Sequence, residues 1–193
     1  MSAPTRVVPV PRSVPQMDRA GVMKLIADAG HTIDEKKYPL FLVGVRGYYL
    51  DTMGKAGVND RGIYDDAIFV CSPNVFAAFN ANTDPSVTRK NMAVLRAGRY
   101  LAHHFGLHRG KYLALVQRAG AVTVDRDDAK SETGYFGINI HKGANSSTSS
   151  EGCQTIPPKQ WDAFIKLVEA EARRLYVQQW MRKTIPYILL NGA

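Results

Sequence analysis

The chain has 193 residues, of which 45% are hydrophobic, and its formal net charge is +8. A chain of this length and apolar content is large enough to form one globular domain with a sizeable core. No apolar run reaches the ~18 residues of a membrane-spanning helix, and two cysteines, Cys71 and Cys153, are too few for a disulfide framework. Because Lys and Arg are spread along the chain and no nucleic-acid module is recognised, we interpret the charge first as a solvated basic surface. Attraction to an anionic envelope is the alternative, and nucleic-acid binding ranks last.

The N-terminal part of the chain is expected to form an arm and a helix. Residues 1–16 are rich in proline, which disfavours helix and sheet pairing, and they are expected to form an extended arm. Residues 17–193 are expected to form a single domain. Its first element is a helix over 17–29, with Asp18 near its start and Gly30 as its stop.

Strands are expected where β-branched and aromatic residues gather between turn signals. A glycine-containing turn indicates a hairpin in the middle of the chain. After two prolines, apolar residues recur at helical spacing over 159–176, which predicts a second helix with Trp161 in the core. This pattern predicts an α+β, mainly β domain with one or two flanking helices. The expected strands cover 40–50, 68–71, 98–107, 111–117, 121–125 and 184–190.

Histidines and aspartates elsewhere in the sequence do not predict a metal site. His103 and His104 are neighbours on an expected strand and point to opposite faces, so they do not face one ion easily, and no zinc motif accompanies them or His108. The aspartates of the turn-rich stretch 51–66 lack the spacing of a calcium loop and are interpreted as turn caps. We therefore expect no metal and no cofactor.

The most informative stretch is 137–157, GINIHKGANSSTSSEGCQTIP. A short apolar segment leads to His141, a loop of small polar residues follows, and Cys153 stands before an apolar exit. A cysteine acts as a nucleophile in its thiolate form, and a neighbouring imidazole can take the thiol proton. The backbone N–H groups of Gly152 and Cys153 are expected to face a developing oxyanion, and the loop hydroxyls are candidates for orienting the imidazole.

This stretch resembles the active-site signature of the L,D-transpeptidase catalytic domain, in which a His-Gly follows a strand and Ser-His-Gly-Cys follows a loop. The resemblance implies that Cys153 is the nucleophile, that His141 is the base, and that Ser150 and Gly152 are the matching motif positions. It also implies a mixed β sheet or sandwich and peptidoglycan stem peptides as the substrate. Weaker similarity extends over residues 94–165.

Departures from the signature leave the substrate, and the choice between hydrolysis and transfer, open. Lys142 is inserted after the histidine, and Glu151 stands where the family often has a second histidine. A Gln-Thr pair replaces the usual apolar-Arg pair after the cysteine. The residues that we expect to contact the substrate are Ser149, Gln154, Asn139 and Lys142.

Residues 43–165 are also similar to bacteriophage-encoded proteins with a Ser-x-Gly-Cys-Gln motif, some of which are cell-wall lysins. The N-terminal stretch lacks the apolar region of a secretory signal, so we expect a protein that stays in the host cytoplasm until it is released to the cell wall. We therefore expect a bacteriolytic, endolysin-like cysteine peptidase that degrades peptidoglycan within an anionic bacterial envelope. The alternatives are an L,D-transpeptidase that forms cross-links and an inactive phage structural or wall-binding protein.

Overall fold

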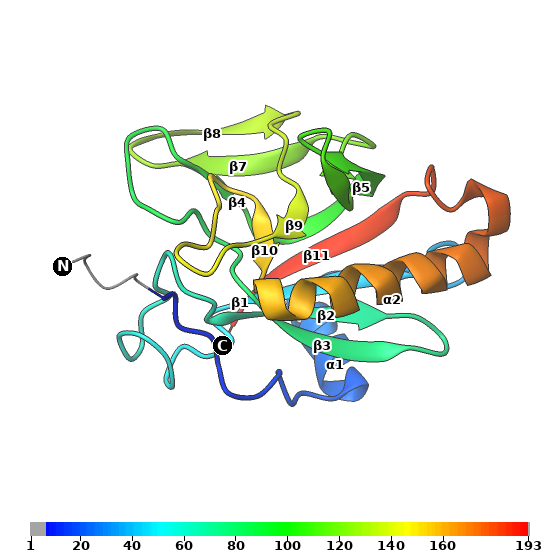
Figure 1. Cartoon of the computed structure of the whole chain (residues 1–193), viewed down its shortest axis with the longest axis horizontal. Coiled ribbons are helices and arrows are strands. Elements are labelled where there is room, and N and C mark those ends of the chain that lie inside the picture. The colour runs from blue at the N-terminus through cyan, green and yellow to red at the C-terminus, as the bar shows by residue number, and fades with distance from the viewer. Residues whose placement is uncertain (1–6, 193) are drawn as a thin grey trace.

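The computed structural model describes residues 7–192, which form a mainly β fold with two sheets and two α-helices (Figure 1). This confirms the predicted α+β, mainly β class. The first six residues of the expected arm lie outside the described residues. The helices are α1 (Arg19–Asp28), α2 (Pro158–Tyr176) and the short 3-10 helix η1 (Val177–Gln179). The strands are β1 (Phe41–Arg46), β2 (Asp66–Cys71), β3 (Phe76–Ala81), β4 (Ala93–Leu95), β5 (Gly98–His108), β6 (Tyr112–Gln117), β7 (Val122–Arg126), β8 (Ala129–Gly134), β9 (Ile140–Lys142), β10 (Gln154–Ile156) and β11 (Ile185–Asn191).

The large sheet has eight strands in the order β10-β9-β6-β5-β11-β1-β2-β3, and it is mixed. β1 pairs in parallel with β11, β9 pairs in parallel with β10, and the other pairs are antiparallel. The two edge strands are tied together just past the end of β3, where Asn82 and Thr155 exchange backbone hydrogen bonds of 2.9 and 2.8 Å. The sheet therefore nearly closes on itself, and the separate three-stranded sheet β4-β7-β8 lies beside it.

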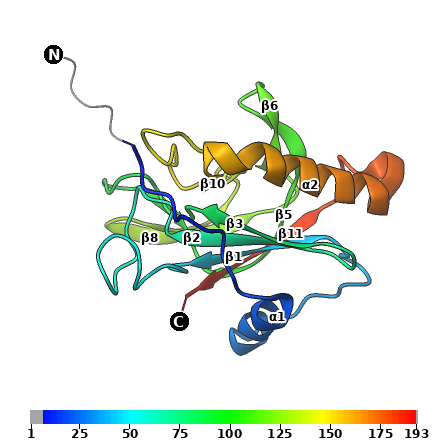
Figure 2. The same ribbon diagram turned by 60° about the horizontal axis from the view of Figure 1, so that its bottom comes forward.

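Both faces of the large sheet are covered, because α1 and α2 lie on opposite sides of it (Figure 2). Side chains alternate along a strand, so Leu42 of β1 packs in the cluster that contains Phe164 of α2, whereas Phe41 and Val43 pack with Ile26 of α1. This two-sided burial explains the nearly continuous apolar sequence of β1 and β11.

Local sequence signals set the start of each α-helix. The Asp18 side chain accepts a hydrogen bond of 2.8 Å from the N–H of Gly21, which makes it the N-cap of α1. Pro158 occupies the first turn of α2, where its missing N–H costs nothing. Trp161 is buried in the core, as expected.

Several strands differ from the prediction. The strand expected over 40–50 ends at Arg46, because Gly47 adopts a positive φ of 70° and begins a turn. β3, β4 and β8 were not predicted. β3 is rich in alanine, and β8 is polar and mostly exposed, so each is defined by pairing with its neighbour rather than by its own composition.

The described part of the arm, residues 7–16, packs against the domain. Val8 is buried with Ile63 and Tyr64, and the N–H of Val8 donates to the carbonyl of Asn145 over 2.8 Å. Asn145 belongs to the loop between the predicted catalytic histidine and cysteine. The arm therefore helps to fix that loop.

Candidate active site

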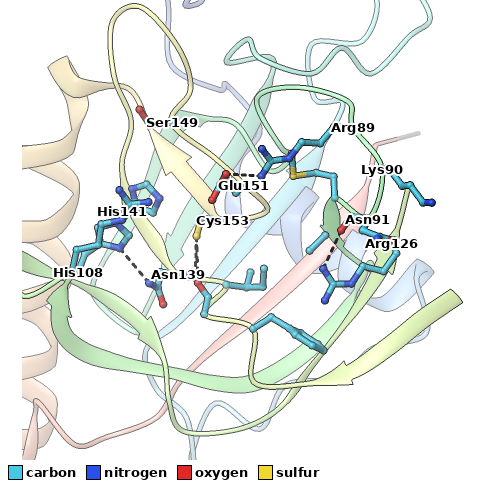
Figure 3. A pocket seen from close by; sticks show the side chains of 16 residues that line it. Arg89, Lys90, Asn91, His108, Arg126, Asn139, His141, Ser149, Glu151 and Cys153 are labelled. Atoms are coloured by element: carbon cyan, nitrogen blue, oxygen red, sulfur yellow. Dashed lines mark hydrogen bonds and ion pairs between the residues drawn. The ribbon is translucent and has the colours of Figure 1, made fainter. Parts of the chain in front are cut away.

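A cavity of about 520 Å³ lies between the small sheet and the β9–β10 edge of the large sheet (Figure 3). One wall comes from the segment 89–93 and from Arg126 at the end of β7. The opposite wall comes from the turn between β5 and β6, from β9 and from the loop 149–153. Both His141 and Cys153 line this cavity, so the fold brings together the two residues that the sequence singled out.

The parallel pairing of β9 with β10 explains why His141 and Cys153 face the same cavity. Gln154 is opposite Ile140, so Cys153, one residue earlier, lies beside Asn139. Paired residues of neighbouring strands point to the same face, and successive residues alternate. Cys153, Asn139 and His141 therefore share the cavity face, whereas Gln154 and Ile140 point into the core.

The hydrogen bonding of His141 defines which ring nitrogen can act as a base. Its Nδ1 lies 2.8 Å from the carbonyl oxygen of Lys142, which can only accept, so Nδ1 carries the proton and Nε2 has a free lone pair. Burial, helped by the charges of His108 and Arg109, lowers the pKa of His141 to about 4. The ring is therefore neutral at pH 7 and is able to accept a proton.

The Cys153 thiol lies against the segment that precedes β9. Its Sγ accepts a hydrogen bond of 3.4 Å from the N–H of Asn139 and lies 3.4 Å from the carbonyl oxygen of Gly137. Burial raises the pKa of Cys153, and the Asn139 N–H and the Arg109 charge offset only part of that rise. Within residues 7–192, no hydrogen bond joins this thiol to His141. At neutral pH the cavity thus holds a neutral thiol and a neutral imidazole.

A second histidine, His108, lies in the same cavity and was missed as a partner of the first. It stacks on His141 with ring centroids 4.0 Å apart and planes 21° apart. It is the last residue of β5, and the pairing of β5 with β6 and of β6 with β9 brings this end of the strand to the cavity. The sequence offers this histidine only as a candidate zinc ligand beside a hairpin turn, and no local pattern links it to His141.

An aromatic column supports the two histidines from α2. Tyr112 contacts His108 with ring centroids 5.5 Å apart, and Trp161 contacts Tyr112 at 5.9 Å. Trp161 in turn packs on Phe164 in the core. Helix α2 therefore supports the histidine pair through Trp161 and Tyr112.

Two motif positions have roles that differ from the expectation. The N–H of Gly152 donates to Ser150 Oγ over 3.0 Å, so it does not face an oxyanion. Ser150 Oγ in turn donates to the carbonyl of Cys153 over 2.7 Å, which makes this buried serine a support for the cysteine rather than a reacting group. Only the N–H of Cys153 then remains of the two expected donors.

Glycine is required at position 152 by the backbone rather than by close approach of a substrate. Gly152 has φ +129°, and a Cβ atom there would lie 2.5 Å from the carbonyl oxygen of Ala93 in β4. Strand β4 of the small sheet therefore packs directly against the turn that precedes Cys153.

The four expected substrate contacts divide into two pairs. Ser149 and Asn139 line the cavity. Gln154 is fully buried, donating to the Gly152 carbonyl at 3.1 Å and accepting from the Tyr187 hydroxyl at 2.9 Å, so that expectation is corrected by its position on the core face. Lys142 has an exposed side chain that does not line the cavity, and only its carbonyl serves the site.

The loop hydroxyls stabilise the loop and do not orient the imidazole. Thr148 Oγ1 lies 2.7 Å from Ser86 Oγ, and the N–H of Ser150 donates to the same Ser86 hydroxyl over 2.8 Å. The orientation of His141 comes instead from its own backbone neighbour, Lys142.

Positive charge dominates the cavity wall. Arg89 pairs with Glu151 over 2.7 Å, and Arg126 is held by Glu132 at 2.8 Å and by the carbonyl of Asn91 at 3.1 Å. Lys90 and Arg109 also line the cavity, and neither forms an ion pair among the described residues. Arg109 lies in the turn between β5 and β6 and Arg126 ends β7, so both reach the cavity only through the pairing of distant strands.

Nothing in the described chain, residues 7–192, brings three His, Cys, Asp or Glu side chains together in a way that could hold a metal ion. His103 is buried and donates from Nε2 to the carbonyl of Ile138 over 2.7 Å, and His104 bonds the carbonyl of Phe105. Cys71 and Cys153 are both free thiols. Among the described helices, none is long and apolar enough to cross a membrane.

Comparison of the chain with protein-family models, with curated proteins and with solved structures gave no match. The function is therefore argued from the geometry of the cavity and from the motif.

Proposed function

We propose that this cavity is the active site of a cysteine peptidase that cleaves stem peptides of peptidoglycan, with a reaction like that of the L,D-transpeptidase domain that the motif resembles. The observation that carries the proposal is that Cys153 and a neutral His141, whose Nε2 lone pair is free, line the same cavity from two neighbouring strands. A thiol and an imidazole with a free Nε2 lone pair in one cavity are the two groups that nucleophilic catalysis by cysteine requires.

The reaction begins when Cys153 Sγ attacks the peptide carbonyl carbon and His141 Nε2 takes the thiol proton. The carbonyl oxygen becomes an oxyanion, to which the N–H of Cys153 donates. As the C–N bond breaks, the imidazolium returns its proton to the leaving amine, and a thioester remains. A water molecule then attacks the thioester while His141 takes its proton, and the thiolate leaves and is reprotonated.

The charge of the cavity supports a substrate that carries carboxylates. Arg89, Lys90, Arg109 and Arg126 line it together with a single acid, Glu151. Complementary charge increases the rate of encounter and disfavours wrong partners. Stem peptides carry free carboxylates, which the basic side chains of the cavity attract, whereas a neutral peptide lacks this electrostatic attraction.

The test is incubation of the protein with isolated peptidoglycan, followed by mass spectrometry of the soluble products. The wild type is expected to release peptides, Cys153→Ala is expected to release none, and His141→Gln is expected to be about 10²–10⁴-fold slower. Cys71→Ala is the matched control, because it removes the other thiol and leaves the cavity unchanged.

Each result has a defined meaning. New peptide–peptide linkages in place of released peptides would assign transfer rather than hydrolysis. Sugar fragments released equally by the wild type and Cys153→Ala would overturn the cysteine mechanism. Binding to the wall without any reaction would identify a wall-binding protein instead.

A further inference from the structure

The oxyanion pocket is one donor short in the mechanism above. Gly152 donates its N–H to Ser150 Oγ, so only the N–H of Cys153 is left of the two expected groups. Glu151 accepts from Arg89 and, as a carboxylate, has no proton to donate. Stabilisation of a developing oxyanion by preorganised donors is a large part of acyl-transfer catalysis, so a second donor is worth seeking in the same cavity.

The tautomer of His108 follows from a chain of hydrogen bonds. The N–H of Gln117 donates to Asn139 Oδ1 over 2.9 Å, which fixes the orientation of that amide. The Asn139 Nδ2 group therefore faces His108 Nδ1, 3.2 Å away, and donates to it. Because Nδ1 accepts, the proton of the neutral His108 ring is on Nε2.

The resulting Nε2–H is available to a ligand. His108 is only 7% exposed and lines the cavity. Within the described residues its Nε2 has no hydrogen-bond partner, yet it is not among the polar atoms that are sealed off from solvent. The two stacked rings thus offer complementary functions, with a proton acceptor at His141 Nε2 and a proton donor at His108 Nε2.

We propose that His108 is a further catalytic residue, whose Nε2–H donates a hydrogen bond to the carbonyl oxygen that becomes negative when Cys153 attacks. This inference rests on the proposed peptidase function. His108 transfers no proton in this role. It keeps its Nε2–H throughout, while His141 carries the thiol proton to the leaving amine.

Two substitutions separate the donor from the ring. His108→Phe keeps an aromatic ring that can stack on His141 but removes the donor. His108→Gln replaces the ring with an amide whose Nε2–H₂ lies near the position of the imidazole Nε2. His104→Phe is the matched control, since the same replacement on the same strand leaves the cavity unchanged.

The measurements are kcat and KM on a soluble stem peptide, and the rate of Cys153 alkylation by iodoacetamide, which needs no oxyanion donor. We expect His108→Phe to lower kcat by about 10²–10³-fold with little change in KM or alkylation rate. His108→Gln is expected to recover part of kcat, and His104→Phe is expected to match the wild type. Inhibition by a peptide aldehyde, which forms an oxyanion on the thiol, is expected to weaken in His108→Phe in parallel with kcat.

The outcomes distinguish this inference from the proposed function. An active wild type with unchanged kcat and aldehyde inhibition in His108→Phe would overturn the role of His108 alone. Loss of activity that His108→Gln does not recover, together with a changed alkylation rate, would show that the ring only positions His141. A wild type with no activity on wall peptides would overturn both proposals.

Discussion

At the scale of single residues, the site combines a thiol that is hard to ionise with an imidazole that is hard to protonate. Burial raises the pKa of Cys153 and lowers that of His141 to about 4, so the resting pair is uncharged. Many cysteine enzymes use a preformed thiolate with a lowered pKa. The proposed mechanism instead requires proton transfer during attack, with His141 as the base.

The pH dependence of kcat/KM tests this account. His141 must be neutral to accept the thiol proton, and it is neutral at every pH well above about 4. We expect activity to fall on the acid side with a midpoint near pH 4 rather than at the pKa of an ordinary histidine, near 6.5. Alkylation of Cys153 should increase with pH up to a midpoint above the ordinary cysteine range. An acid midpoint near 6.5 would contradict the assignment.

Gly152→Ala tests the turn that presents the cysteine. The new Cβ would collide with the Ala93 carbonyl, and φ +129° is unfavourable for alanine. We expect a loss of about 1–3 kcal/mol in unfolding free energy and a larger loss of kcat, since Cys153 is displaced. Gly30→Ala is the matched control, because Gly30 has φ +73° with no atom within 4 Å of the added Cβ. Equal effects of both variants on kcat would argue against the contact.

At the scale of elements, the contiguous motif was predictable and its surroundings were not. His141 and Cys153 lie in one stretch with a recognisable pattern, so the sequence placed them together. His108, Arg109 and Arg126 reach the cavity only through pairing of β5 with β6, of β6 with β9, and of β4 with β7. Such long-range pairing has no local signature. The strand β8 was missed for another reason, because its residues are polar and mostly exposed.

Tyr64 links the arm to the loop between His141 and Cys153, and its hydroxyl gives a prediction at this scale. It donates to the Ala144 carbonyl over 2.8 Å, and the N–H of Tyr64 donates to the carbonyl of Pro9. Tyr64→Phe leaves that loop carbonyl without its donor, so we expect a loss of about 1–3 kcal/mol in unfolding free energy and a lower kcat. Tyr38→Phe is the control. Denaturant unfolding and peptide turnover measure both effects, and unchanged kcat would show that the loop does not need this anchor.

At the scale of the whole molecule, a buried acidic network joins the turn region to the large sheet. Asp66 accepts hydrogen bonds of 2.6 Å from the N–H groups of Gly47 and Thr83, and Asp84 pairs with Arg46 at 3.1 Å. The sequence interpretation of the aspartates as turn caps holds for Asp66 in part. The full burial of Asp65 and Asp66 could not be predicted, because it depends on how the turn folds back over the sheet.

Asp65 makes the stability of the fold depend on pH. It is fully buried, its Oδ1 has no partner among the described residues, and burial raises its pKa to about 7. The folded state therefore binds more protons than the unfolded state between about pH 4 and pH 7, so stability falls as pH rises through this range. At pH values above 7, we expect Asp65→Asn to unfold at a higher temperature than the wild type. This gain in the midpoint of thermal unfolding should disappear below about pH 4.

The control for this prediction is Asp51→Asn, at an exposed position in the same region. It should leave the midpoint of thermal unfolding unchanged at both ends of the pH range. A thermal midpoint of Asp65→Asn that is lower than that of the wild type at pH 8 would contradict the proposed cost of the buried charge.

The most direct test of the central claim is to trap the acyl-enzyme. A stem peptide is mixed with the protein, the reaction is stopped with acid, and the intact protein mass and its digest are measured. We predict a mass increase equal to the acyl fragment on Cys153 in the wild type, with no adduct in Cys153→Ala. Peptide release by Cys153→Ala at the wild-type rate, or an adduct on another residue, would contradict the mechanism.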